Sequence, residues 1–113
     1  MSINLSRLAD MAEELTIDSS TLTGSPTYDL IGTLDENPVQ IIFDNQSDTA
    51  IGISNNNTTT WHTFPSGEAI ILDMRGNHGI ADNFTFRKGM SLYAIGTAGT
   101  GNFSISYTYA VSP

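Results

Sequence analysis

The sequence predicts a mainly β protein, an antiparallel, jelly-roll-like β-sandwich of seven or eight strands that follows a short N-terminal helical arm. Three observations predict this fold class. After residue 27, apolar side chains recur at every second position, which is the period of a strand with one buried face. Turn-forming sequences separate these runs at intervals of roughly ten residues. Before residue 16, the apolar residues instead follow the period of a helix.

Length and composition limit the class of protein. The chain has 113 residues, of which 39% are hydrophobic and 14% charged, with a formal net charge of -8 and no cysteine. This length is typical of a single domain. We expect no nucleic-acid or membrane partner, because an acidic chain lacks the basic face that both require. Thiol catalysis, disulfides and Cys-ligated zinc are excluded, and no apolar run is long enough for a membrane helix or signal peptide.

The N-terminal segment combines a helical pattern with a linker composition. One apolar stripe fits a helix over residues 4–15, and its expected contact residues are Leu5, Leu8, Ala12 and Leu15. Such a short helix is marginal alone, so the stripe must dock on its own domain or on a neighbouring subunit. Residues 16–27 are polar and end in Gly-Ser-Pro, which favours a tether. The expected units are therefore an arm over residues 1–27 and a β domain over 28–113.

Seven runs after residue 27 have strand character. They cover residues 28–34, 39–44, 51–53, 69–73, 84–86, 91–95 and 103–109. The run AIILD at 69–73 is apolar almost throughout, which is typical of a buried strand. The aromatic residues are expected to divide between core and interface, and phenylalanines are favoured for the core because tyrosine keeps a polar tip that prefers a wet edge. The aromatic residues concerned are Phe84, Phe86, Tyr93, Phe103, Tyr107 and Tyr109.

Charge is unevenly distributed between the two expected units. Seven of the twelve acidic residues fall within the first 36 positions, where Arg7 is the one cation. The remaining chain is nearly neutral and rich in Asn, Thr and Ser. We therefore expect the arm to be an acidic contact segment, and deletion of residues 1–20 to leave a folded β domain that no longer assembles.

Residues able to bind a metal or act as a nucleophile have simpler structural interpretations. His62 and His78 lack a ligand-spaced partner, so two loop histidines are favoured over a metal shared with Asp73 or Asp82. No G-x-S-x-G motif surrounds a serine, and the acids of residues 34–38 lack calcium-loop spacing. We expect no catalytic residue, no metal and no cofactor. A hydrolase with paired carboxylates is the enzymatic rival.

The glycine-rich segment 96-GTAGTG-101 is expected to be a hairpin turn. A phosphate-binding loop leads into a helix whose N-terminal amides face the anion. Here the following residues, 103–109, alternate as a strand does. The glycines are therefore interpreted as positions of positive φ or close strand approach.

Trp61 ends the polar run 55-NNNTTTWH-62. An aromatic side chain in a polar loop stacks on a sugar, anchors a protein contact or folds back over its own core. The Asn/Thr-rich surroundings suit a glycan and another subunit equally. Trp61 and His62 are therefore the candidate glycan or protein contacts of the β domain.

Three segments within residues 39–110 resemble a group of small virion proteins of tailed bacteriophages. They are 39-VQIIFDNQSDTAIGIS-54, 64-FPSGEAIILDM-74 and 88-KGMSLYAIGTAGTGNFSISYTYA-110. The shared elements are an N-x-[ST]-D turn at Asn45–Asp48, a P-x-G turn at Pro65–Gly67 and a hairpin over Gly89–Gly101. The glycine that often follows the second strand in this group is replaced by Ser54–Asn57.

The resemblance implies a non-enzymatic structural protein, made in the host cytoplasm and located in the virion. Its expected partners are other virion proteins, such as the major capsid protein or neck and tail proteins. A homo-oligomer is expected, with a trimer favoured and the arm docked on a neighbouring subunit. A capsid decoration or cement protein is the leading expectation. The alternatives are a neck, tail or baseplate component, and a receptor- or glycan-binding module of a tail or fibre.

Overall fold

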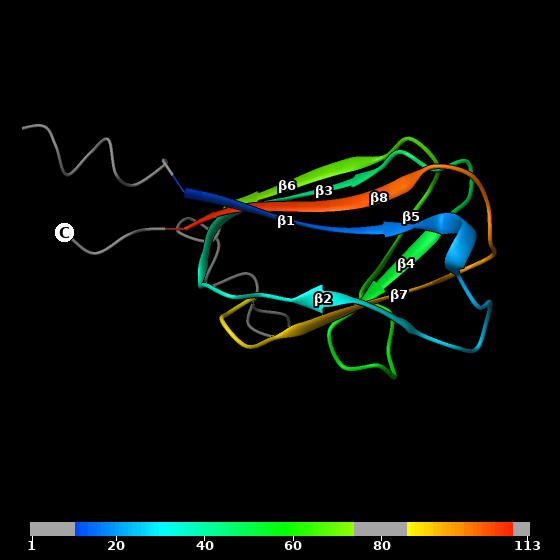
Figure 1. Ribbon diagram of the computed structural model, residues 1–113, viewed down its shortest axis with the longest axis horizontal. Helices are drawn as coiled ribbons and strands as arrows, with labels where there is room; N and C mark the ends of the chain where they lie inside the picture. The colour runs from blue at the N-terminus through cyan, green and yellow to red at the C-terminus, as the bar shows by residue number, and fades with distance from the viewer. Residues whose placement is uncertain (1–10, 74–85, 110–113) are drawn as a thin grey trace, which may run out of the picture.

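The computed structural model describes residues 11–73 and 86–109. They form eight strands in two antiparallel four-stranded sheets, with the orders β1-β8-β3-β6 and β2-β7-β4-β5. The two sheets lie face to face, as in a β-sandwich (Figure 1). The predicted mainly β, antiparallel class is therefore confirmed. Within this part of the chain, no helix is long and apolar enough to cross a membrane.

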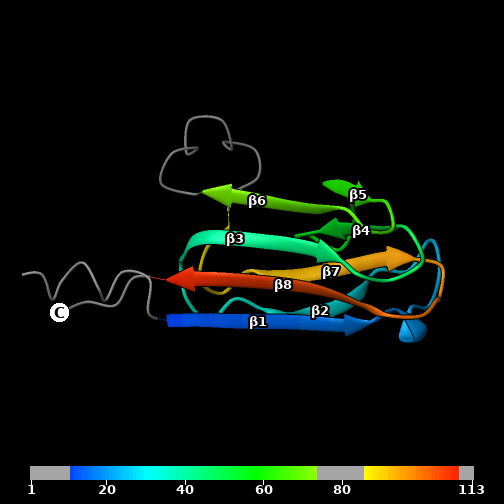
Figure 2. The ribbon, with the colours of Figure 1, turned by 90° about the horizontal axis from the view of Figure 1, so that it is seen from above.

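Each sheet has two central and two edge strands. The first sheet contains β1 (Met11–Asp18), β3 (Pro38–Asn45), β6 (Ala69–Asp73) and β8 (Asn102–Tyr109). The second contains β2 (Asp29–Thr33), β4 (Ile51–Ser54), β5 (His62–Phe64) and β7 (Ser91–Gly96). Figure 2 shows the first sheet from outside, with β6 and β1 at its two edges.

The core is built by the alternation that the sequence predicts. In β8, Phe103, Ile105 and Tyr107 are buried, while the intervening Ser and Thr side chains face outward. Phe43 in β3 and Phe64 in β5 are fully buried and contribute from the two sheets. Their ring centroids lie 5.6 Å apart. Aromatic contacts therefore join the two layers of the sandwich.

The helix predicted over residues 4–15 is wrong for residues 11–15, which lie in β1. Strand β1 pairs with β8 along its whole length, from Met11 opposite Tyr109 to Asp18 opposite Asn102. Leu15 and Ile17 fall on the core side, because alternate positions of a strand share a face. A long pairing of this kind outweighs the weak propensity of a three-turn helix. Of the predicted arm contacts, Ala12 and Leu15 lie in β1, while Leu5 and Leu8 lie outside the described residues.

The segment predicted as a tether, residues 16–27, is part of the sandwich over its first half. Ile17 and Leu22 are buried in the core. A short 3-10 turn, η1 (Ser19–Thr21), is capped by the Asp18 carboxylate, which accepts a 2.9 Å hydrogen bond from the Ser20 N–H. The division predicted at residue 27 therefore does not separate two units of the described chain.

Two further elements differ from the sequence prediction. The strand β5 was not expected, because its three residues are too few to show a period. Phe86 was placed in a strand, but it lies in a loop, with its side chain buried in the core. The rest of that predicted strand, residues 84 and 85, lies outside the described residues.

Candidate assembly surface

The turn motifs that carry the resemblance meet around the buried side chain of Asn45. Its Nδ2 donates to the backbone oxygens of Thr49 and Phe64 at 2.9 Å and of Pro65 at 3.2 Å. Its Oδ1 accepts from the N–H of Ser47 at 3.0 Å and from the Ser47 hydroxyl at 2.6 Å. Since Asn45 is fully buried, these bonds satisfy every polar group of its side chain. The N-x-[ST]-D turn is thus tied to the P-x-G turn that follows Phe64.

The glycine-rich turn packs against the same N-x-[ST]-D turn. Asp48 Oδ1 accepts a 2.8 Å hydrogen bond from the N–H of Thr100, and the Asp48 N–H donates to the Thr100 oxygen at 2.9 Å. Gly101 has a φ of +98°, and a Cβ there would lie 2.6 Å from the backbone oxygen of Gln46. These motifs therefore hold the turns together at one end of the sandwich, and their residues have a structural role.

Trp61 contributes to the core. Its ring is partly buried and lies 5.2 Å from that of Phe43 and 5.7 Å from that of Phe86, measured between centroids. This is the fold-back arrangement that the sequence left as an alternative to an external contact. The contact between Trp61 and a glycan stays a prediction, to be carried by the exposed part of the ring.

His62 makes a polar contact between the edges of the two sheets. Its Nε2 lies 2.8 Å from Oε1 of Glu68, the residue before β6, and both side chains are a little over one-third exposed. His62 also packs edge-on against Phe64, with centroids 4.6 Å apart. Over residues 11–73 and 86–109, no group of three or more His, Cys, Asp or Glu side chains is arranged to hold a metal. His78 and Asp82 lie outside those ranges.

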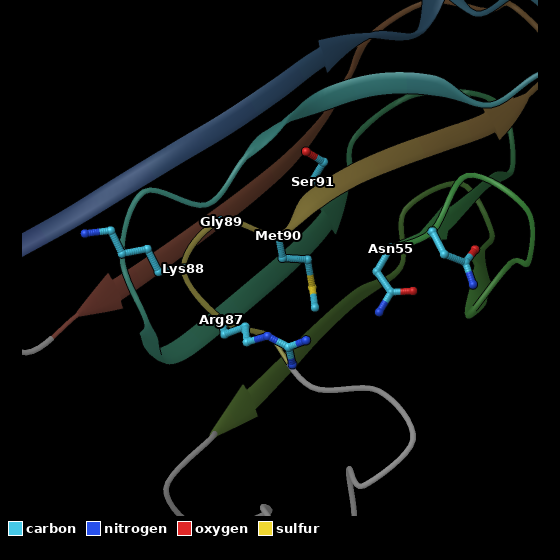
Figure 3. A pocket seen from close by; sticks show the side chains of 7 residues that line it. Asn55, Arg87, Lys88, Gly89, Met90 and Ser91 are labelled. Carbon is cyan, nitrogen blue, oxygen red and sulfur yellow. The ribbon is translucent and has the colours of Figure 1, made fainter.

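An open, polar hollow of about 550 Å³ lies where the loop after β4 faces the turn before β7. It is lined by Asn55, Asn56 and residues 87–91. Figure 3 shows the side chains of Arg87 and Met90 directed toward Asn55, while Lys88 points away. The hollow combines amide, hydroxyl and guanidinium groups, which are the groups that bind sugar hydroxyls or carboxylates.

Three of the four sheet edges have features that oppose pairing with another chain. Strand β1 carries Glu13, Glu14 and Asp18, strand β2 has a register shift between Leu30 and Gly32, and strand β5 has only three residues. Charges, bulges and short length all protect edge strands. The fourth edge, β6, pairs with β3 without any register shift and carries one charged residue, Asp73, at its end.

The edge strand β6 presents an apolar side chain to solvent. Ile71 is 62% exposed, the highest value among the large apolar residues of the described chain. It lies opposite Ile42 of β3, which in turn lies opposite Ser106 of β8. The buried strand predicted at residues 69–73 is therefore a strand at an edge, and its apolar composition marks a surface that sequence reasoning missed.

The outer face of the β1-β8-β3-β6 sheet continues this surface. Strand β8 contributes only uncharged small or polar side chains to it, namely Asn102, Ser104, Ser106 and Thr108. An apolar depression of about 210 Å³ lies between β3 and β8, lined by Gln40, Ile42, Ser106, Tyr107 and Thr108. We call Ile42, Ile71 and the edge of β6 the assembly surface.

Comparison of the chain with protein-family models, curated proteins and solved structures gives no match in any of the three. The assembly surface combines an exposed apolar side chain with the least protected of the four sheet edges of the described residues. Ile71 faces solvent there, and no strand of the described residues pairs with the outer edge of β6.

Proposed function

We propose that this chain is a non-enzymatic structural protein of a tailed-bacteriophage virion, which assembles with copies of itself and with other virion proteins. The observation that carries the proposal is the assembly surface. A weakly protected strand edge beside the exposed Ile71 and the half-buried Ile42 is a surface that proteins bury on association. Ile71 and Ile42 supply the apolar part, and strand β6 supplies the edge.

The strand order supports assigning the fold to the jelly-roll class. Four antiparallel pairs join the first half of the chain to the second: β1 with β8, β2 with β7, β3 with β6, and β4 with β5. The chain is thus one long hairpin wrapped around a core, closed by the β3–β8 and β4–β7 pairs. Jelly rolls are common in viral capsid proteins and in lectins.

Within the virion, a capsid decoration or cement protein is the position we propose first. The sequence resemblance supports a virion location, and a small single sandwich with an adhesive edge suits repeated weak contacts on a symmetric shell. A neck, tail or baseplate component would use the same surface. A decoration protein and a neck, tail or baseplate component would differ in the virion protein that they bind, and would share the same fold.

Fractionation of particles tests this proposal. Heads and tails separated from the phage that encodes the chain are analysed by mass spectrometry. A decoration protein is recovered with the heads, whereas a neck, tail or baseplate component is recovered with the tails. Recovery of the chain only from the particle-free lysate would contradict a structural role in the virion.

A glycan-binding module is a second candidate, favoured by the polar hollow. Its lining combines Arg87 with the amides of Asn55 and Asn56, and a jelly roll also suits a lectin. A glycan array probed with the purified chain and with Arg87→Ala tests it. Binding that the substitution abolishes supports a receptor-binding role, and an array without signal removes this candidate.

A further inference from the structure

We infer that β6 pairs with β6 of a second copy of this chain, antiparallel and across a two-fold axis at Ile71. The two outer sheets then join into one continuous sheet. This inference rests on the proposed function, since it names the partner of the assembly surface. It can nevertheless fail alone, because it concerns the purified chain and the proposed function concerns the particle.

The backbone of β6 is oriented for such pairing. The backbone N–H of Asn45 donates to the backbone oxygen of Glu68 at 2.9 Å. This bond shows which residues of the β3–β6 ladder direct their N–H and C=O groups toward each other. Since this direction alternates along an antiparallel strand, Ile70 and Leu72 direct their N–H and C=O groups toward β3. Those of Ala69 and Ile71 point to the outer edge. In the proposed register the two copies of Ile71 therefore exchange a pair of backbone hydrogen bonds.

The side chains of β6 are self-complementary in this register. Ile71 meets Ile71 of the second copy on the outer face, so the most exposed large apolar side chain of the described residues becomes covered. Ile70 lies opposite Leu72 of the second copy on the core side, where both residues are only partly buried. Apolar and β-branched pairs stabilise neighbouring strands. A shift by one residue removes these matches, because it places outward side chains opposite inward ones.

The charges of β6 do not oppose the pairing. Asp73 lies opposite Ala69 of the second copy, and the two Asp73 residues are about 13 Å apart along the strands. This distance exceeds the Debye length of about 8 Å at physiological ionic strength. The net charge of -8 on each copy weakens association at low salt. We therefore expect added salt to tighten the dimer.

A second copy fits this edge better than an extended segment of a different protein. The pattern of β6 is nearly symmetric about Ile71, and a two-fold interface requires one surface to match itself. The contact is short, since β6 has five residues, so it predicts a dimer dissociation constant in about the micromolar range. Such a weak contact suits a subunit that is held in place by further neighbours.

Sedimentation velocity of the full chain tests the pairing. We expect reversible association from 12.2 kDa to twice that mass as concentration rises. Ile71→Lys places two cations across the axis and should weaken the dimer by about 100-fold or more. Leu30→Lys is the matched control, because Leu30 is 57% exposed on the edge strand of the other sheet. It should leave the dimer unchanged.

Charge rescue separates pairing from a general effect on the fold. Ile71→Glu alone should also be monomeric, while an equimolar mixture of Ile71→Lys and Ile71→Glu should form mixed dimers. Hydrogen exchange gives a second readout, because the Ile71 amide should be protected only when the chain is dimeric. Four results would overturn the inference. The first is a chain that stays monomeric up to about 1 mM, a concentration well above the dissociation constant predicted from the contact size. The others are a trimer, a dimer that survives Ile71→Lys, and a mixture of the two variants that forms no mixed dimer.

Discussion

The side-chain amide of Asn45 donates to the backbone oxygen of Phe64 at 2.9 Å and so joins the two sheets at one end of the sandwich. Asn45 ends β3 of one sheet, and Phe64 ends β5 of the other. The bond is fully buried, where an unmade hydrogen bond is costly. This bond explains why the N-x-[ST]-D turn begins with asparagine: its side chain satisfies buried backbone oxygens at the end of the core.

Asn45→Ala should lower the free energy of unfolding by about 2–4 kcal/mol, because it leaves several buried backbone groups without partners. Urea denaturation measures the loss. Asn55→Ala, at the surface hollow, is the control and should change stability by less than about 0.5 kcal/mol. A similar loss in both variants would show that the buried amide is not the stabilising group.

Gly101→Ala should destabilise the protein more than Gly67→Ala, by at least about 1 kcal/mol. Both glycines have positive φ, +98° and +86°, so each alanine carries a backbone strain of about 1–2 kcal/mol. Only at Gly101 would the added Cβ also meet another backbone atom, since the space at Gly67 is open. Thermal unfolding of the two variants makes the comparison. Equal losses would refute the close approach of the two turns.

Stability should fall as the pH rises above about 10, through Tyr107. Burial raises the pKa of Tyr107 above its ordinary value of 10.0, although the N–H of Asp35 donates to its hydroxyl. Because Tyr107 then ionises at a lower pH in the unfolded chain than in the folded chain, its contribution to the free energy of unfolding is fully present below pH 10. This contribution is lost as the pH rises above that value. Denaturation at a series of alkaline pH values should show a flatter dependence in Tyr107→Phe. Identical slopes for the two proteins would contradict this assignment.

Deletion of residues 1–20 should unfold the domain, which reverses the expectation from sequence. It removes the whole of β1 and the buried side chain of Ile17, a loss comparable with the total stability of a small domain. Deletion of residues 1–10 is the control, since it leaves all eight strands intact. Circular dichroism and a melting curve decide the matter. A folded, stable 21–113 fragment would restore the interpretation of this segment as a tether.

The elements that the sequence predicted well are those with one unambiguous period. Strand β8 alternates Phe103, Ile105 and Tyr107 with Ser and Thr, and only a strand with one buried face gives that pattern. The glycine-rich segment before β8 is a turn between strands, as predicted, but the predicted hairpin is wrong, because β7 and β8 lie in different sheets and the segment connects the two layers. In both cases local chemistry and tertiary structure favour the same conformation.

Other elements depend on pairing that no local pattern reveals. The residues of β1 fit a helical stripe as well as a strand, and the availability of the β8 edge decides between them. The run AIILD predicts a strand, but whether it lies at the centre or edge of a sheet depends on the order of all four strands. The assembly surface at Ile71 therefore emerges only from the assembled fold.

The most direct test of the virion role is the copy number of this chain in intact particles. Particles purified through successive density gradients are digested, and the chain is quantified against the major capsid protein with labelled standard peptides. A structural protein predicts a ratio that stays constant from one gradient to the next. A ratio that falls toward zero with each purification step would contradict the account.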